Sequence, residues 1–113
     1  MAKVRINWGA APEDRPVRLF EVYNTAHRSL LVLAPDRSSA IEIAHSANHI
    51  HWIWNRKDIS YPHAAEVRDP LRHEDLADCV EPIQAAIAQR LQGTVHREGD
   101  HVCVGYQVLG DCK

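Results

Sequence analysis

The sequence lacks the features that mark several common functional classes. It contains no GxGxxG, GxxxxGK[ST], GxSxG or EF-hand motif, and its 113 residues include only five glycines. A loop that cradles phosphate through backbone N–H groups is therefore hard to build. No apolar run reaches the roughly 18 residues of a transmembrane helix. The segment Met1–Ala11 lacks the apolar core of a signal peptide.

Cysteine is also scarce, and the spacing of the cysteines does not indicate a metal site. The three cysteines, Cys79, Cys103 and Cys112, form no CxxC spacing, and an odd number cannot all pair within one chain. Together with the missing export signal, this predicts reduced thiols and a cytoplasmic location. We expect Cys103, which lies in a strand-like run, to pack as a small apolar side chain. Cys79 has a predicted buried, structural role.

Positively and negatively charged residues nearly balance in this sequence. Thirteen Lys and Arg against fifteen Asp and Glu give a net charge of −2. No global basic field draws the protein to nucleic acid or to anionic lipid, so neither partner is favoured. The length fits one domain over residues 1–113.

Apolar alternation predicts most of the strands. Residues 3–8 alternate strictly, residues 17–23 and 29–33 form a hairpin, and residues 50–54 alternate again. Residues 29–33 are almost wholly apolar, as in a central strand covered on both faces. A closing hairpin pairs residues 94–97 with 101–109. Its second strand is predicted to turn four side chains inward: Val102, Val104, Tyr106 and Val108.

Two helices are predicted from capping and 3.6-residue spacing. The first begins after Asp36, or one turn later in a capping box of Ser39 and Glu42, and runs to about Asn48. Its buried face is Ala40, Ile43, Ala44 and Ala47. The second covers about residues 73–92, with Pro82 either kinking it or opening a separate helix. Between the fourth strand and this helix, residues 55–72 are predicted to form an irregular loop.

The expected fold is therefore a single small α+β domain with an antiparallel or mixed sheet of about five or six strands, in the order β-ββ-α-β-α-ββ. Both helices are predicted to pack on one face. The strongly apolar strands then leave the second face in need of a cover. A partner chain is the simplest cover, so we expect a homodimer or a subunit of a larger protein.

The sharpest cluster of chemistry-bearing residues is His45-x3-His49-x-His51. His45 and His49 lie one helical turn apart, and Glu42 lies three residues before His45, opposite the alanine face. Such a pair can bind a divalent transition metal, with Glu42 as an oxygen ligand and His51 as a further candidate. An ordinary polar helix face explains the same pattern.

Trp52 and Trp54 form a second cluster on one face of the predicted strand 50–54. They serve either as core packing or as an aromatic surface for a partner chain or a stacked ligand.

The mixed-charge segment 56–75 could hold acid and base groups, with Tyr61, His63 and His73 as candidates. A solvated loop with exposed ion pairs accounts for it as well.

These observations order the functional hypotheses. The first is a non-catalytic interaction or accessory module that self-associates through its sheet and needs no cofactor. The second is a divalent-metal or small-ligand binding domain built on His45 and His49. A small enzyme working from residues 56–75 comes third, and a nucleic-acid binder fourth.

Overall fold

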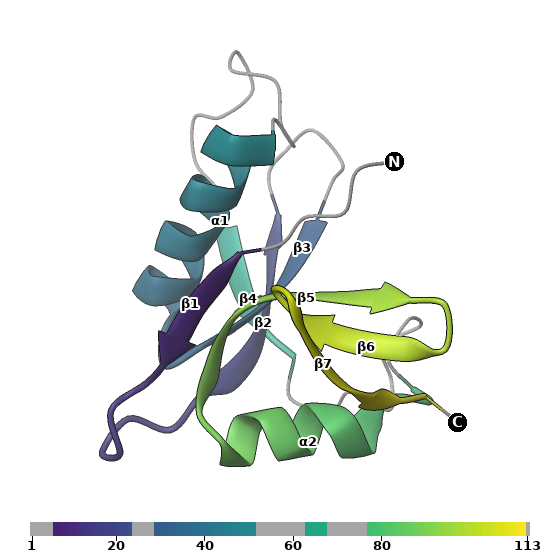
Figure 1. The fold of residues 1–113 in the computed structure, drawn as a ribbon. Helices are drawn as coiled ribbons and strands as arrows, with labels where there is room; N and C mark the ends of the chain where they lie inside the picture. Colours follow the sequence, from purple (N-terminus) through teal and green to yellow (C-terminus); the bar gives the residue numbers. More distant parts are fainter. Residues whose placement is uncertain (1–5, 24–28, 52–62, 68–76, 113) are drawn as a thin grey trace.

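The computed structural model describes residues 6–23, 29–51, 63–67 and 77–112. These residues form a seven-stranded antiparallel sheet and two helices (Figure 1). The strands are β1 (Asn7–Ala10), β2 (Arg18–Tyr23), β3 (Ser29–Ala34), β4 (His63–Glu66), β5 (Leu91–Glu98), β6 (His101–Val104) and β7 (Gln107–Asp111). The helices are α1 (Arg37–His51) and α2 (Val80–Ala88). The α+β class is confirmed. Within the described ranges, neither helix combines the length and hydropathy that crossing a membrane requires.

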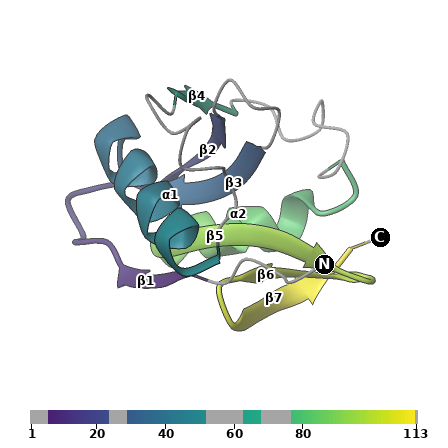
Figure 2. The ribbon, with the colours of Figure 1, turned by 90° about the horizontal axis from the view of Figure 1, so that it is seen from above.

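The sheet has the spatial order β4-β2-β3-β5-β6-β7, and β1 pairs with the first part of β5. Figure 2 shows β4 and β7 at opposite edges. The sheet has more strands than expected because the run 101–109 turns at Gly105, whose φ is +58°. β6 and β7 are therefore separate strands, and Tyr106 and Val108 are 68% and 59% exposed. The prediction that these two side chains face inward is wrong, whereas Val102 and Val104 are buried as expected.

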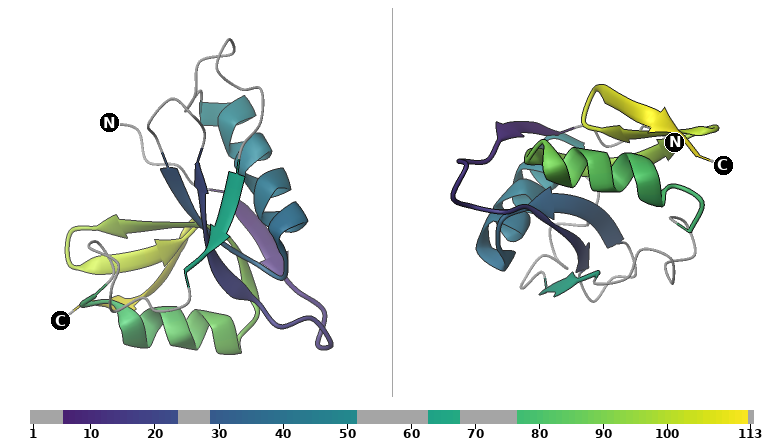
Figure 3. Two further views of the ribbon diagram at one scale, coloured as in Figure 1. Left: turned by 180° about the vertical axis from the view of Figure 1, so that it is seen from behind. Right: turned by 90° about the horizontal axis from the view of Figure 1, so that it is seen from below.

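Two apolar clusters lie on opposite faces of the sheet. Neighbouring residues of β2 divide between them, because successive side chains of a strand point to opposite faces. Phe20 packs with Ile43 and the alanine face of α1. Leu19 packs with Ile83 and the other buried residues of α2. Seen from below, α2 lies across the sheet on its own side (Figure 3).

The prediction that both helices pack on one face is therefore wrong. The almost wholly apolar β3 does indicate coverage on both sides, but the second cover is α2 rather than a partner chain. Leu33 lies in the α2 cluster and Val32 in the α1 cluster, and both are fully buried. The homodimer was expected because one apolar face of the sheet was predicted to lack a cover. Since α2 covers that face, this reason for a homodimer no longer holds.

α1 begins at the first of the two predicted positions. The Oδ1 atom of Asp36 accepts a hydrogen bond from the Ser39 N–H at 2.7 Å. This satisfies one of the N–H groups that a helix start leaves without a partner. The helix continues to His51, so the predicted strand 50–54 is wrong for residues 50 and 51. Trp52 and Trp54 lie outside the described residues.

The fourth strand lies further along the chain, inside the predicted irregular loop. β4 pairs with β2, with Tyr23 opposite His63 and Phe20 opposite Glu66. The N–H of Val67 continues this pairing with a hydrogen bond of 2.8 Å to the Leu19 carbonyl oxygen. The other residues of the predicted loop lie outside the described ranges.

The second helix is shorter than expected. Within the described part of the predicted span, residues 77–92, the helix covers Val80–Ala88, and Pro82 falls in its first turn, where a missing N–H costs nothing. Arg90 ends the helix in the left-handed region, with φ of +57°. Leu91 continues the apolar spacing of the helix but belongs to β5.

Two of the three cysteines are joined. Cys79, just before α2, forms a disulfide with Cys112, just after β7, at a sequence separation of 33. The prediction of three reduced thiols is wrong for this pair. Cys103 keeps its thiol and is buried, as predicted.

Candidate metal centre

The hairpin of β5 and β6 places His96, Glu98, His101 and Cys103 on one face, and the potential ligand atoms of His96, Glu98 and Cys103 lie close together. The register pairs His96 with Cys103 and Glu98 with His101. Gly99, with φ of +61°, allows the two-residue turn that sets this register. Residues directly opposite one another share a face, as do residues two apart on one strand. His96, Glu98 and Cys103 therefore point to the same side, away from α2.

The potential ligand atoms of the three side chains are close together. The Nε2 atom of His96 lies 3.9 Å from Oε2 of Glu98. The Sγ atom of Cys103 donates a hydrogen bond of 3.8 Å to the same oxygen. All the potential ligand atoms of this cluster lie within 4.8 Å of one another. A single ion could thus contact all three.

These separations are close to those that zinc requires. Bonds of about 2.3 Å to sulfur and 2.0–2.2 Å to nitrogen and oxygen, in a tetrahedron, place the ligand atoms about 3.4–3.6 Å apart. The separations observed from Glu98 to His96 and to Cys103 exceed these by a few tenths of an ångström.

Burial is graded across the cluster. Cys103 is 2% exposed, the His96 side chain 14%, and the Glu98 side chain 36%. Both ring nitrogens of His96 are buried. An ion would therefore enter past the carboxylate and meet the sulfur at the bottom.

The charge of this set suits a divalent ion. A thiolate and a carboxylate supply two negative charges, and the imidazole is neutral when it binds a metal. The resulting cluster with one divalent cation has no net charge, which lowers the cost of its burial. Three protein ligands leave a fourth tetrahedral position for water. A nucleophilic role for Cys103 fits less well, since reactive cysteines are partly exposed.

A bulge adjoins the cysteine. In the β6–β7 pairing the register shifts between Val102 and Cys103, so that Val102 lies opposite Gly110 but Cys103 lies opposite Val108. The extra residue is Leu109 on β7. Bulges of this kind change the direction of neighbouring side chains and are frequent beside functional sites.

No protein-family model, curated protein sequence or solved structure matches this chain.

A second group of ligand-type residues is Asp78, Cys79 and Cys112. Two of its three members are bonded to each other in the disulfide. Disulfide sulfurs are not thiolates, so this group offers no comparable site in the structure.

The predicted metal cluster on α1 is only partly described. Glu42 and His45 are exposed on α1, opposite the buried alanine face, as predicted. His49 and His51 lie on the same helix, and their side chains are outside the described part. His51 is the last helical residue rather than a residue beyond the helix. The metal hypothesis for this cluster stays a prediction.

Of the remaining predicted site residues, the structure describes the backbone of His63 alone, so these predictions stay predictions. Tyr61 and His73, like Trp52 and Trp54, lie outside the described residues. His63 is placed as the first residue of β4, opposite Tyr23.

Sequence reasoning missed His96 and Glu98 altogether and interpreted Cys103 as packing alone. A signal was present: Gly99 followed by Asp100 favours a two-residue turn. That turn pairs Glu98 with His101 and therefore His96 with Cys103. The predicted closing hairpin instead had a three-residue turn over 98–100. That turn shifts the pairing by one residue, so that Cys103 no longer lies opposite His96 and points to the other face of the hairpin.

Proposed function

We propose that this protein is a small, non-catalytic metal-binding domain that holds one divalent transition-metal ion, zinc first of all, between His96, Glu98 and Cys103. The observation that supports the proposal is the convergence of these three ligand types on one face of the β5–β6 hairpin, within 4.8 Å of one another. A mixed imidazole, thiolate and carboxylate set is typical of zinc.

The proposal is tested by calorimetric titration of the oxidised protein with zinc at pH 7.5, without thiol reagents. One equivalent is expected to bind to the wild type. Replacing a ligand is expected to weaken binding at least about tenfold, because even substitution of residues that only hydrogen-bond to metal ligands costs about 10–100-fold. Glu98→Gln is the main variant, since this side chain is 36% exposed and the replacement keeps its shape. Cys103→Ser is the second, with circular dichroism as a check on folding.

Two matched controls separate this site from the alternatives. His101→Ala removes an exposed histidine of the same hairpin that pairs with Asp111, and it is expected to leave zinc binding unchanged. His45→Ala removes a member of the predicted cluster on α1. If His45→Ala abolishes binding and Glu98→Gln does not, the ion belongs to α1 and the proposed site is wrong.

Self-association is the second candidate function, on grounds other than those of the sequence. β7 is an edge of the described sheet, and Val108 on it and Tyr106 before it are among the most exposed large hydrophobic residues. Trp8, 42% exposed, lies on β1, whose first residue Asn7 adjoins Gly105. Edge strands with apolar side chains pair readily with another chain. A second copy of this chain, paired through β7, is the proposed partner.

Sedimentation at micromolar concentration tests this second candidate. Wild type is expected to sediment as a dimer and Val108→Lys as a monomer, because a lysine on an edge strand opposes pairing. Gln84→Lys, on an exposed residue of α2, is the matched charge control. A wild-type monomer at all concentrations rejects the dimer.

The cytoplasmic location expected from the sequence now has less support. It rested on the missing export signal and the cysteine pattern, which also predicted free thiols, whereas Cys79 and Cys112 form a disulfide. Disulfides persist mainly in oxidising compartments.

A further inference from the structure

The proposed metal ligands lie on a part of the sheet that we call the arm, which consists of residues 96–98 of β5 together with β6 and β7. β3 pairs with β5 only through residues 93–95, whereas β6 pairs with residues 95–98. His96 and Glu98 therefore lie beyond the part of β5 that β3 supports. Figures 1 and 3 show the hairpin of β5, β6 and β7 extending away from β2 and β4.

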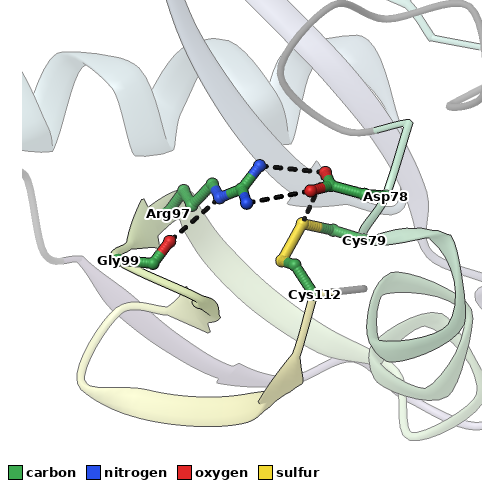
Figure 4. Close-up of polar contacts among 5 residues, drawn as sticks. All are labelled: Asp78, Cys79, Arg97, Gly99 and Cys112. Atoms are coloured by element: carbon green, nitrogen blue, oxygen red, sulfur yellow. Dashed lines mark hydrogen bonds and ion pairs between the residues drawn. A yellow bond between two sulfur atoms is a disulfide. The ribbon is translucent and has the colours of Figure 1, made fainter.

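Three contacts fix the end of this arm, and Figure 4 shows two of them, the disulfide and the Arg97–Asp78 ion pair. The Cys79–Cys112 disulfide joins the end of β7 to the start of α2. The Cys112 N–H donates a hydrogen bond of 2.6 Å to the carbonyl oxygen of Asp100, in the β5–β6 turn. Arg97 pairs with Asp78 through two contacts, Nη1 to Oδ1 at 2.9 Å and Nη2 to Oδ2 at 2.8 Å.

These contacts act on the metal ligands from the opposite face. Arg97 lies between His96 and Glu98 on β5, so its side chain points to the α2 side while theirs point away. Asp78, which holds it, is the residue before Cys79. The disulfide therefore sets the position of the carboxylate that anchors Arg97 and of the backbone N–H that anchors the turn.

We propose that the Cys79–Cys112 disulfide is a redox latch on the metal site, so that the oxidised protein binds the ion tightly and reduction weakens binding. This inference rests on the proposed metal-binding function of His96, Glu98 and Cys103. Reduction leaves the end of β7 joined to α2 only by noncovalent contacts, so the Cys112 N–H holds Asp100 in the β5–β6 turn less firmly. The turn end of the hairpin then frays into positions in which Glu98, the ligand next to the turn, is apart from His96 and Cys103. Binding from a partly populated competent state is weaker in proportion to that population.

The reduction itself follows ordinary thiol–disulfide chemistry with a dithiol as reductant. A thiolate of the dithiol attacks Sγ of Cys112, which is partly exposed, and Sγ of the fully buried Cys79 leaves. The second thiol of the reductant then displaces Cys112 from the mixed disulfide. In total two electrons and two protons pass to the protein, and the dithiol becomes a disulfide.

Access and product stabilisation both favour this route. A surface pocket of about 210 Å³ is lined by chain neighbours of the two cysteines, Asp78, Val80 and Asp111 among them. Sγ of Cys79 lies 3.5 Å from Oδ1 of Asp78. Once protonated, the Cys79 thiol can donate to this oxygen, which Arg97 also contacts. After reduction, the Cys79 thiol therefore competes with Arg97 for the Asp78 carboxylate, and so weakens the ion pair that holds the arm.

The test compares zinc dissociation constants by calorimetry for three forms: oxidised wild type, wild type reduced by a phosphine that offers no thiol, and the Cys79→Ala/Cys112→Ala variant. The latch predicts that both forms without the disulfide bind zinc about 5–150-fold more weakly, the usual range of coupling between two sites. Arg97→Gln, which keeps the disulfide, is expected to give a smaller weakening of the same sign. Arg15→Gln, which removes the ion pair to Asp36 elsewhere in the fold, is the matched control.

The outcomes separate the latch from the function on which it rests. If oxidised wild type binds no zinc, the proposed function itself fails. If the Cys79→Ala/Cys112→Ala variant binds zinc as tightly as the oxidised wild type, the metal site stands and the latch is overturned. Tighter binding by the reduced wild type than by this variant is assigned to the freed Cys79 and Cys112 thiolates beside Asp78. Should the alanine variant fail to fold by circular dichroism, the reduced wild type and Arg97→Gln decide between these results.

Discussion

Removing the Cys79–Cys112 bond is expected to destabilise the fold substantially. The bond closes a loop across a sequence separation of 33 residues, for which the chain-entropy relation gives about 3.7 kcal/mol at 25 °C. A domain of this size has about 5–15 kcal/mol of stability in total. The Cys79→Ala/Cys112→Ala variant is therefore expected to remain folded in water but to unfold at a much lower urea concentration.

The assay is urea denaturation followed by circular dichroism, with the zinc site kept empty by a chelator. Because Cys79 is fully buried, its replacement by alanine also removes packing contacts. The reduced wild type, which keeps both side chains, isolates the contribution of the covalent bond. A loss of less than about 1 kcal/mol in the reduced protein would refute the reasoning, since it would mean that the loop is already constrained when unfolded.

Three further substitutions test the fold by the same denaturation assay. Asp36→Ala is expected to cost about 1 kcal/mol at pH 7 by loss of the helix cap. The hydrogen bond from the Ser39 N–H lowers the pKa of Asp36 below its ordinary 3.8, so the stabilisation by this carboxylate is present above pH 4 and lost as the pH falls through the lowered pKa. A difference between wild type and Asp36→Ala that is undiminished at pH 2 would contradict the assignment. Gly93→Ala is expected to prevent folding or to displace the N-terminal segment, since the added Cβ would lie 2.3 Å from the carbonyl oxygen of Ile6; a variant as stable as wild type would show that this crossing is misplaced. Ile83→Ala is expected to cost about 2–5 kcal/mol because the side chain is fully buried, and a cost below 1 kcal/mol would argue against α2 as the cover of the second face.

Local signals in the sequence were sufficient for the start and the buried face of α1, and for the presence of the β5–β6 hairpin but not for its register. The cap at Asp36 and the spacing of Ala40, Ile43, Ala44 and Ala47 each depend on residues within one or two turns. The end of α1 was harder to predict. Ile50 continues the helical spacing from Ala47 and also begins a short apolar alternation, and a few residues cannot distinguish these two periods.

Errors over α2 and the faces of the sheet have a different cause. The apolar spacing that runs to Leu91 does not reveal that Arg90 takes a left-handed conformation and starts a strand. The apolar β3 indicates that both faces are covered, but whether a helix or a partner covers the second depends on the path of the chain. Local pattern carries no information on that path.

The site and the disulfide depend on contacts between distant residues. Cys79 and Cys112 are separated by 33 positions, and nothing local indicates that they pair rather than either with Cys103. The cluster of His96, Glu98 and Cys103 depends on register, and a shift of one residue sends Cys103 to the other face. Only the turn at Gly99 specifies that register in the sequence.

The central claim is that one divalent ion binds to His96, Glu98 and Cys103, and cobalt spectroscopy tests it most directly. In the oxidised protein Cys103 is the cysteine that keeps its thiol, so a thiolate-to-cobalt charge-transfer band can come from no other residue. We predict that Co²⁺ added to the oxidised wild type gives this band together with tetrahedral d–d bands, that one equivalent saturates both, and that zinc displaces them. A cobalt spectrum without the charge-transfer band, or one that Cys103→Ser leaves unchanged, would contradict the account.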